Sequence, residues 1–427
     1  MEETTYQDDN PSWLQKLKNE SWEAEILVSA VAIFAIFKSF AVFNWICDLF
    51  INKLNPSQYN IGYMITVLGF LAFGILGALF VIHFGLRAYW IGLVGLNSVF
   101  PDYSIEDTAY SKAFTEKMLK KLPRLQNSIK NLDEICSVIF SVAFTLLLIY
   151  CYLGIFGAVY LLLYNLLSDF IPSYILLAPL VFMAIVYSNQ MIITVIANIK
   201  KFKENEKIQT WYYKSTIWGS AILYGPLYKN LLQVTMIFGS NFKKKKALVR
   251  TLIFMLVFGA ALGLYKLTES NFTYLLGFYK NEDQTRIYNS YYSTNNLEKS
   301  LLLTPEIETE LITSNTTKLF IPIFDFEISA YEKSCSLDEL PTTNEEEKSL
   351  SRQAYLTCYL ENHSIFIDDI VQDIKIFKTD HPITNQFGVQ TFLNLSEFEN
   401  GNHTLKIVKQ KKTDDGKTWV IPFYISR

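Results

Sequence analysis

The strongest constraint on this chain is a set of five apolar stretches, each long enough to cross a lipid bilayer as a helix. A spanning helix needs about 20 predominantly apolar residues. In lipid, every backbone N–H and C=O group must be hydrogen-bonded within the protein, as it is in a helix. The stretches cover residues 26–51, 61–86, 135–163, 174–199 and 247–267. The sequence therefore predicts a polytopic α-helical membrane domain with five spans over residues 26–267.

The loops between these stretches predict how the chain is oriented in the membrane. Short turns join the first stretch to the second and the third to the fourth, which predicts two antiparallel hairpins. The longer loops are basic, and residues 200–246 hold ten lysines against two glutamates. Because cytoplasmic loops are enriched in Lys and Arg, we expect loops 97–134 and 200–246 and the N-terminal segment 1–25 to be cytoplasmic. An odd number of spans then places the C-terminal tail outside the cytoplasm.

One more segment, residues 216–240, is long enough to cross the membrane and would reverse the position of the tail. Polar residues Lys229, Asn230 and Gln233 lie away from one apolar helical stripe. The stripe consists of Leu223, Leu227, Leu231, Val234 and Phe238. That pattern is typical of a helix lying in the membrane interface. We expect the same of a short helix that begins at Asn10 within residues 1–25, so the predicted membrane domain has five spans plus interfacial helices.

The last 160 residues have a different composition, with 15 Lys and Arg against 24 Asp and Glu. Residues 268–317 are polar and mixed in pattern, and they are expected to form a connecting segment that is partly helical or irregular. From residue 318 to 427, short β-branched and aromatic runs alternate with turn residues, which predicts a β-sandwich. The predicted strands lie at 318–329, 354–361, 364–369, 374–378, 391–398, 403–410 and 418–426.

The end of the chain carries a resemblance to a known fold. The sequence from Leu395 through Gly401, Asn402, His403 and Thr404, followed by the strand that begins at Trp419, resembles the final hairpin of immunoglobulin-like sandwiches in bacterial surface proteins. The resemblance implies an immunoglobulin-like β-sandwich, a fold that hosts many functions and implies no ligand. The expected fold class is thus α + β multidomain.

Two cysteines of the tail, Cys335 and Cys358, are candidates for a disulfide. Disulfides persist in oxidising compartments, so the pairing depends on the predicted position of the tail. A loop of this length would be stabilised by roughly 3 kcal/mol. Cys47, Cys136 and Cys151 lie in apolar runs and are expected to be buried free thiols.

Several polar residues interrupt the apolar stretches and are candidates for a functional role. Lys38 lies near the middle of the first stretch, where it either pairs with a carboxylate along a polar path or extends its ammonium toward the interface. Asp48 is expected at a helix end, and Asn189 and Gln190 are expected to hydrogen-bond between helices. His83 and Arg87, four residues apart, would form a proton relay, bind an anionic headgroup or anchor the helix at the membrane boundary.

Further signals concern partners. A basic run beside the fifth span is expected to contact anionic lipid headgroups rather than nucleic acid; it consists of Lys243, Lys244, Lys245 and Lys246. Small residues at Gly74 and Ala78 allow helices to approach closely, either within the chain or between copies, so a homo-oligomer stays open. We find no catalytic motif, no metal-binding spacing and no cofactor fingerprint, and expect no enzyme.

These features favour one function and leave a second open. We expect a bacterial inner-membrane protein that displays its extracytoplasmic, periplasmic sandwich to bind a protein partner or support an envelope assembly. The alternative is an oligomeric channel or transporter with a polar path through the helices, in which Lys38, Asn189 and Gln190 would take part.

Overall fold

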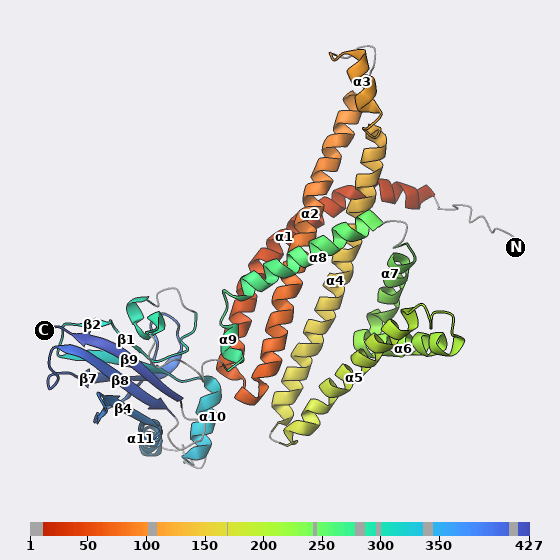
Figure 1. Ribbon diagram of the computed structural model, residues 1–427. Helices are drawn as coiled ribbons and strands as arrows, with labels where there is room; N and C mark the ends of the chain where they lie inside the picture. Colours follow the sequence, from red (N-terminus) through yellow and green to blue (C-terminus); the bar gives the residue numbers. More distant parts are fainter. Residues whose placement is uncertain are drawn as a thin grey trace. The chain divides into compact units, whose positions relative to one another are not determined.

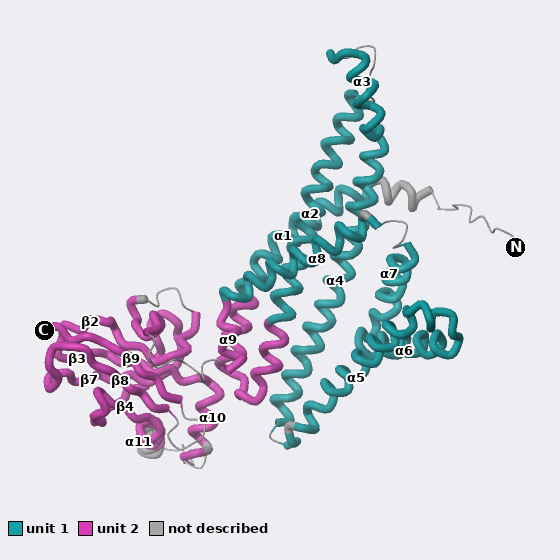
Figure 2. The backbone as a smooth tube through the Cα atoms, viewed as in Figure 1, with its two compact units in different colours: residues 1–41, 67–269 teal, residues 42–66, 270–427 magenta. Residues whose placement is uncertain are grey.

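The chain folds into two compact units, coloured separately in Figure 2. The computed structural model describes residues 12–100, 109–168, 170–241, 246–277, 287–295, 300–335, 345–409 and 417–427. The helical unit consists of Met1–Ala41 and Val67–Glu269. The C-terminal unit consists of Ser270–Arg427 together with Val42–Thr66, which is the tip of the first helical hairpin.

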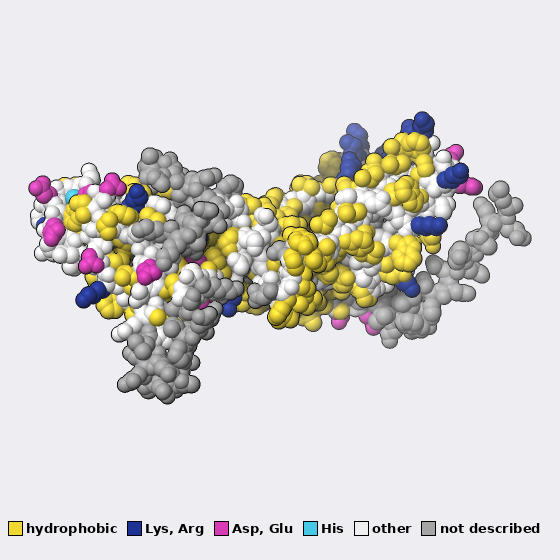
Figure 3. Space-filling model, turned by 90° about the horizontal axis from the view of Figure 1, so that it is seen from below, with side chains coloured by type: hydrophobic (Ala, Val, Ile, Leu, Met, Phe, Trp, Pro, Cys, Tyr) yellow, Lys and Arg dark blue, Asp and Glu magenta, His cyan; other side chains and the backbone are white. Residues whose placement is uncertain are grey.

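Five helices in the described residues are long and apolar enough to cross a membrane (Figure 1). They are α1 (Ser12–Lys53), α2 (Tyr59–Val99), α4 (Leu125–Leu167), α5 (Ser173–Asn198) and α8 (Lys246–Leu267). Each corresponds to one predicted stretch, so the prediction of five membrane-length helices is confirmed. On the face shown in Figure 3, hydrophobic side chains cover much of the helical unit, as lipid-facing helices require.

Helices α2 and α4 extend well beyond their apolar stretches. They contain 41 and 43 residues, which is about 60 Å at 1.5 Å per residue and about twice the hydrocarbon thickness of a bilayer. Prolines set the far ends, because α2 stops two residues before Pro101 and α4 begins two residues after Pro123. The described part of the predicted loop 97–134 is therefore largely helical, with α3 (Lys112–Leu119) between the two long helices.

Two expectations about interfacial helices were wrong in detail. The N-terminal helix is not separate, because α1 runs unbroken from Ser12 to Lys53 and contains no proline or glycine that would end it. Asn10, its predicted cap, lies outside the described residues. Residues 216–240 are not one helix either: α6 (Glu206–Tyr224) and α7 (Tyr228–Asn241) are separated by a 3₁₀ turn.

The break between α6 and α7 follows from two residues. Gly225 adopts a φ of 51°, which side chains disfavour, and Pro226 lacks the backbone N–H that a continuous helix needs. Neither α6 nor α7 is among the membrane-length helices of the described residues. The expectation that this segment does not cross the membrane stays a prediction.

Helix α2 is the most buried of the five long helices. In its most apolar segment 56% of the residues are buried, against 11–22% in the corresponding segments of the other four. Helix α2 packs closely against α8. A Cβ atom on Gly74 would lie 2.4 Å from the carbonyl oxygen of Gly259, and one on Gly263 would lie 2.4 Å from that of Phe70. The small residues of α2 thus allow backbone contact within the chain.

The tail forms two open β-sheets, and two helices follow β3 and precede β4 along the chain. One sheet has the order β1-β3-β7-β6 and the other β2-β9-β8-β4-β5. The strands are β1 (Glu306–Ile307), β2 (Leu311–Ile312), β3 (Thr316–Pro322), β4 (His363–Ile367), β5 (Ile370–Val371), β6 (Phe377–Asp380), β7 (Phe387–Asn394), β8 (Gly401–Lys409) and β9 (Lys417–Ile425). Both sheets contribute to one buried core, with Leu319 and Val389 from the first and Ile407 and Ile421 from the second.

The predicted final hairpin of the tail is present. Strands β8 and β9 pair antiparallel in continuous register from Gly401 opposite Ile425 to Lys409 opposite Lys417. Strand β2 adds to the free edge of β9 in parallel. The immunoglobulin-like arrangement of the whole domain does not follow from this hairpin, because the two sheets are open and are not closed on one another.

One predicted strand is a helix. Residues 354–361 belong to α11 (Glu345–Asn362), and the end of the first predicted strand belongs to α10 (Asp325–Ser334). Among the side chains of α11 that the structure describes, the buried ones are Ser351, Cys358, Tyr359 and Asn362. This is a helical spacing, which the aromatic content of the segment obscured. Predicted strand 374–378 is also mostly irregular, with β6 beginning only at Phe377.

The described residues of the connecting segment 268–317 contain the helical turn α9 (Phe272–Leu275) and the 3₁₀ turns η4 (Asn289–Tyr291) and η5 (Ser293–Asn295). The segment also contributes strands β1 and β2 and the start of β3 to the sheets, which the sequence did not predict. Cys335, at the end of α10, forms a disulfide with Cys358 in α11. This bond ties α10 to α11. Cys47 and Cys136 are buried free thiols, whereas Cys151, expected to be buried, is exposed on α4, a position that lipid can cover.

Candidate functional site

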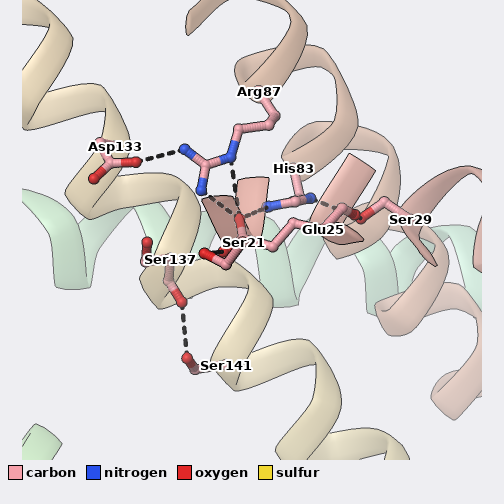
Figure 4. Close-up of polar contacts among 8 residues, drawn as sticks. All are labelled: Ser21, Glu25, Ser29, His83, Arg87, Asp133, Ser137 and Ser141. Carbon is pink, nitrogen blue, oxygen red and sulfur yellow. Dashed lines mark hydrogen bonds and ion pairs between the residues drawn. The ribbon is translucent and has the colours of Figure 1, made fainter. Parts of the chain in front are cut away.

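Three helices of the helical unit bring four ionisable side chains together (Figure 4). Glu25 comes from α1, His83 and Arg87 from α2, and Asp133 from α4. His83 is fully buried and Arg87 is 1% exposed. We call these four residues the ionic cluster. Burying charges is costly unless each is paired, so the pairing decides what the cluster can do.

Arg87 holds the cluster together through its guanidinium. Its Nε donates to Glu25 Oε2 over 3.0 Å, and its Nη2 donates to the same oxygen. Its Nη1 donates to Asp133 Oδ1 over 2.5 Å. The guanidinium carbon also lies 4.9 Å from the ring centroid of Trp90, a favourable cation–π contact. One side chain therefore joins α1, α2 and α4.

His83 occupies the other side of Glu25. Its Nδ1 lies 2.8 Å from the hydroxyl oxygen of Ser29, and that hydroxyl donates to the backbone carbonyl of Glu25 over 2.7 Å. Its Nε2 lies 3.4 Å from Glu25 Oε2 and has no hydrogen-bond partner among the described residues. The ring centroid of Phe140 is 5.1 Å away, so an apolar wall faces the imidazole.

The sequence identified half of this cluster. His83 and Arg87 were recognised as a pair because they lie four residues apart on one helix face. Glu25 and Asp133 were missed, since both precede apolar stretches in segments that read as cytoplasmic and solvated. The available signal was the pair itself: a cationic side chain facing into a helix bundle requires carboxylates on neighbouring helices.

The other polar candidates in the helices do not join this cluster. Lys38 is exposed on α1 and makes no hydrogen bond or ion pair with the described part of the chain. Asn189 donates to Ser215 over 3.3 Å and Gln190 donates to Ser220 over 3.2 Å, which connects α5 to α6. The described contacts therefore do not bring Lys38 to Asn189 or Gln190.

A second polar site lies in the C-terminal unit, where the tip of the first hairpin meets the tail. Asp48 is 8% exposed; its carboxylate accepts a hydrogen bond from Asn271 Nδ2 over 2.7 Å and another from the Ser300 hydroxyl. Asn52 Oδ1 accepts a hydrogen bond from the backbone N–H of Asp325 over 3.1 Å. Hydrogen bonds to Asp48 thus hold the hairpin tip to the tail.

Apolar contacts also join the hairpin tip to the tail. The residues come from both parts of the C-terminal unit and form one buried cluster: Cys47, Ile51, Leu54, Tyr59, Tyr274, Leu275, Leu301 and Phe324. Such burial stabilises by about 25 cal/mol for each Å² of apolar surface removed from water. The hairpin tip is accordingly part of the folded tail domain rather than a flexible tether.

Of the basic run at residues 243–246, the structure describes Lys246. Lys246 is exposed and begins α8, whereas Lys243, Lys244 and Lys245 lie outside the described residues. Their expected contact with lipid headgroups stays a prediction.

The tail domain contains a buried ion pair between Lys409 and Glu327. Lys409 Nζ donates to Glu327 and, over 2.7 Å, to the carbonyl oxygen of Pro322. Burial lowers the pKa of Lys409 despite this partner. His363 is buried nearby, and its burial together with the positive charge of Lys409 lowers its pKa to about 4. These groups hold the end of β8 against α10.

One face of the first sheet presents two large aromatic side chains to solvent. Phe377 is 55% exposed and Phe392 is 58% exposed. Phe377 lies opposite Gln390 in the register, and Phe392 is two residues further along β7, so both project from the same face. Lys318 lies opposite Phe392. We call Phe377 and Phe392 the aromatic face.

A hydrogen-bonded pair on the second sheet predicts a pH dependence. His403 Nδ1 lies 2.6 Å from Asp368 Oδ2, and His403 Nε2 lies 2.8 Å from the Glu399 carbonyl oxygen. Partial burial alone would raise the pKa of Asp368, but the hydrogen bonds from His403 and Thr404 lower it. Partial burial would lower the pKa of His403, yet the bonds to Asp368 and Glu399 raise it.

Asp368→Asn is therefore expected to destabilise the tail domain most in mildly acidic solution. The lowered pKa of Asp368 contributes stability above its unfolded value of 3.8, and the raised pKa of His403 contributes stability below its unfolded value of 6.5. The loss should be below about 1 kcal/mol because solvent screens the pair. Hydrogen exchange of β8 at about pH 5 and about pH 9 measures it.

The matched control for that variant is Asp369→Asn. Asp369 is 90% exposed and only approaches Lys406, at 3.9 Å, so its replacement should change hydrogen exchange equally little at both pH values. An equal loss of protection for Asp368→Asn at the two pH values would contradict the assigned pair.

No protein-family model, curated protein or solved structure matches this chain. Among the described residues, no group of three or more His, Cys, Asp or Glu side chains is arranged to hold a metal ion. The function must therefore be argued from the two polar sites and the aromatic face.

Proposed function

We propose that the protein is a bacterial inner-membrane protein whose tail domain binds a protein partner outside the cytoplasm. The observation that carries this proposal is the aromatic face, because exposed aromatic residues on a rigid sheet are typical of protein interfaces. Two features support it: the domain is fastened to the first hairpin at Asp48, and the disulfide between Cys335 and Cys358 suits an oxidising compartment.

The finer fold of that domain belongs to the same proposal. An immunoglobulin-like sandwich is supported by two sheets that share one core and by the antiparallel final hairpin. The insertion of α10 and α11 between β3 and β4 is a departure from a plain sandwich. Basic loops on one side, including the run that ends at Lys246, support a cytoplasmic N-terminus and contact with anionic lipids.

A photo-crosslinking amino acid in place of Phe377 or Phe392 tests the partner. We expect both positions to give one crosslinked product of the same mass in intact cells. The matched control is Tyr424, an aromatic residue of the second sheet that is 42% exposed, where that product should be absent. No crosslink at either phenylalanine, or the same products at all three positions, would overturn the assignment of this face.

The second candidate function is transport through an oligomer of the helical unit. The ionic cluster favours it, because ionisable residues inside membrane helices often mark ion or proton pathways. Loss of flux in liposomes containing His83→Gln, with normal insertion, would support this candidate, and retained flux would count against it.

A further inference from the structure

The imidazole of His83 is held in one tautomer by its surroundings. The Ser29 hydroxyl has a single hydrogen, which it donates to the Glu25 carbonyl over 2.7 Å. Toward His83 it acts as an acceptor, so Nδ1 carries a hydrogen and donates across the 2.8 Å contact. In the neutral ring, the lone pair is then on Nε2.

That lone pair faces a carboxylate. Nε2 lies 3.4 Å from Glu25 Oε2, an oxygen that already accepts two N–H groups of Arg87. Among the described residues Nε2 has no hydrogen-bond partner, and the ring is fully buried. Two acceptors facing each other in an apolar site repel, and a proton between them converts the repulsion into a charge-assisted contact.

The charges of the cluster lead to the same conclusion. Glu25 and Asp133 carry two negative charges against the single positive charge of Arg87. Among the described residues, the titratable groups that face His83 and its partners are Glu25 from α1, Arg87 from α2, and Asp133 and Cys136 from α4. One added proton on the imidazole makes the set formally neutral.

We propose that Nε2 of His83 is a proton-binding site within the helical unit. A hydronium ion gives its proton to the Nε2 lone pair and leaves water, which gives an imidazolium that donates from Nδ1 to Ser29 and from Nε2 to Glu25. Proton binding then strengthens the joint between α1 and α2. This goes beyond partner binding by the tail and does not depend on it.

The test is ¹⁵N NMR of histidine-labelled full-length protein in lipid nanodiscs, over about pH 5 to 8. We expect the neutral His83 ring to carry its hydrogen on Nδ1 at high pH and both nitrogens to be protonated at low pH. A neutral ring with its hydrogen on Nε2, or a ring that stays neutral throughout, would overturn the proposal.

His83→Gln assigns the signal, because it should remove one of four histidine signals. If that variant does not fold, variants of the other three histidines, which lie in the tail domain, assign it by elimination. Glu25→Gln should reduce the doubly protonated His83 signal at low pH, because it removes the carboxylate that faces Nε2. Asp133→Asn is the matched control, since Asp133 contacts Arg87 and not His83, and an equal loss of that signal in both variants would contradict the assigned contact.

Discussion

Replacing Arg87 by leucine is expected to lower the free energy of unfolding by about 3–5 kcal/mol, because it leaves carboxylates in a buried site without their cation. Glu25 loses two hydrogen bonds and Asp133 loses one. Helices α1 and α4 would then lack their common partner on α2. Thermal and denaturant unfolding of the purified protein in detergent measures the loss.

Two other arginine variants sharpen this test. Arg87→Lys keeps the charge but lacks the planar fork that reaches two carboxylates, so its stability should fall between the wild type and Arg87→Leu. Arg250 is exposed on α8, and Arg250→Leu should change stability by less than about 0.5 kcal/mol. If Arg87→Leu were as stable as Arg250→Leu, the ionic cluster as described would be wrong.

Gly74→Ala is expected to destabilise the packing of α2 on α8 by about 1–3 kcal/mol or more. The new Cβ atom would lie 2.4 Å from the carbonyl oxygen of Gly259 and 2.5 Å from the backbone nitrogen of Gly263. Backbone atoms cannot turn aside as a side chain can, so the two helices must separate. A cysteine crosslink engineered between α2 and α8 should form less efficiently, and the unfolding temperature should fall.

Gly85→Ala provides the matched control on the same helix. A Cβ atom at Gly85 would meet no heavy atom within 4 Å. Since alanine favours a helix over glycine by about 1 kcal/mol, this variant should be as stable as the wild type or slightly more stable. Equal destabilisation by the two substitutions would contradict the close contact of α2 with α8.

The sequence predicted the five membrane-length helices because their signal is local. Apolar length alone identifies a span, and each predicted stretch corresponds to one long helix. The final hairpin was also predicted, from two β-rich runs around a polar turn. The ends of the helices were harder to place, because α2 and α4 continue through polar residues until a proline intervenes.

The tail shows where local patterns fail. Residues 354–361 contain the β-favouring Tyr355 and Thr357, yet they are helical. The positions turned toward the core, from Ser351 through the partly buried Tyr355 to Cys358 and Asn362, lie three or four residues apart. Packing against the core decides between the two structures, and propensity is the weaker influence. A window that began at Glu345 would have revealed the helical period.

The ionic cluster was only half predicted for a different reason. His83 and Arg87 are neighbours on one helix, whereas Glu25 lies 62 residues before Arg87 and Asp133 lies 46 residues after it. Such long-range pairs depend on which helices pack together, and a single sequence contains no direct signal of that. The fastening of Asp48 to Asn271 and Ser300, more than 220 residues away, was missed for the same reason.

Thiol labelling tests most directly the proposal that five spans place the tail domain outside the cytoplasm. Intact spheroplasts are treated with a membrane-impermeant maleimide before and after an impermeant reductant, with Cys335→Ser/Cys358→Ser as the control. We predict labelling of Cys335 and Cys358 from outside only after reduction, because the two form a disulfide. Labelling that requires opened membranes, and needs no reductant, would place the domain in the cytoplasm and contradict the account.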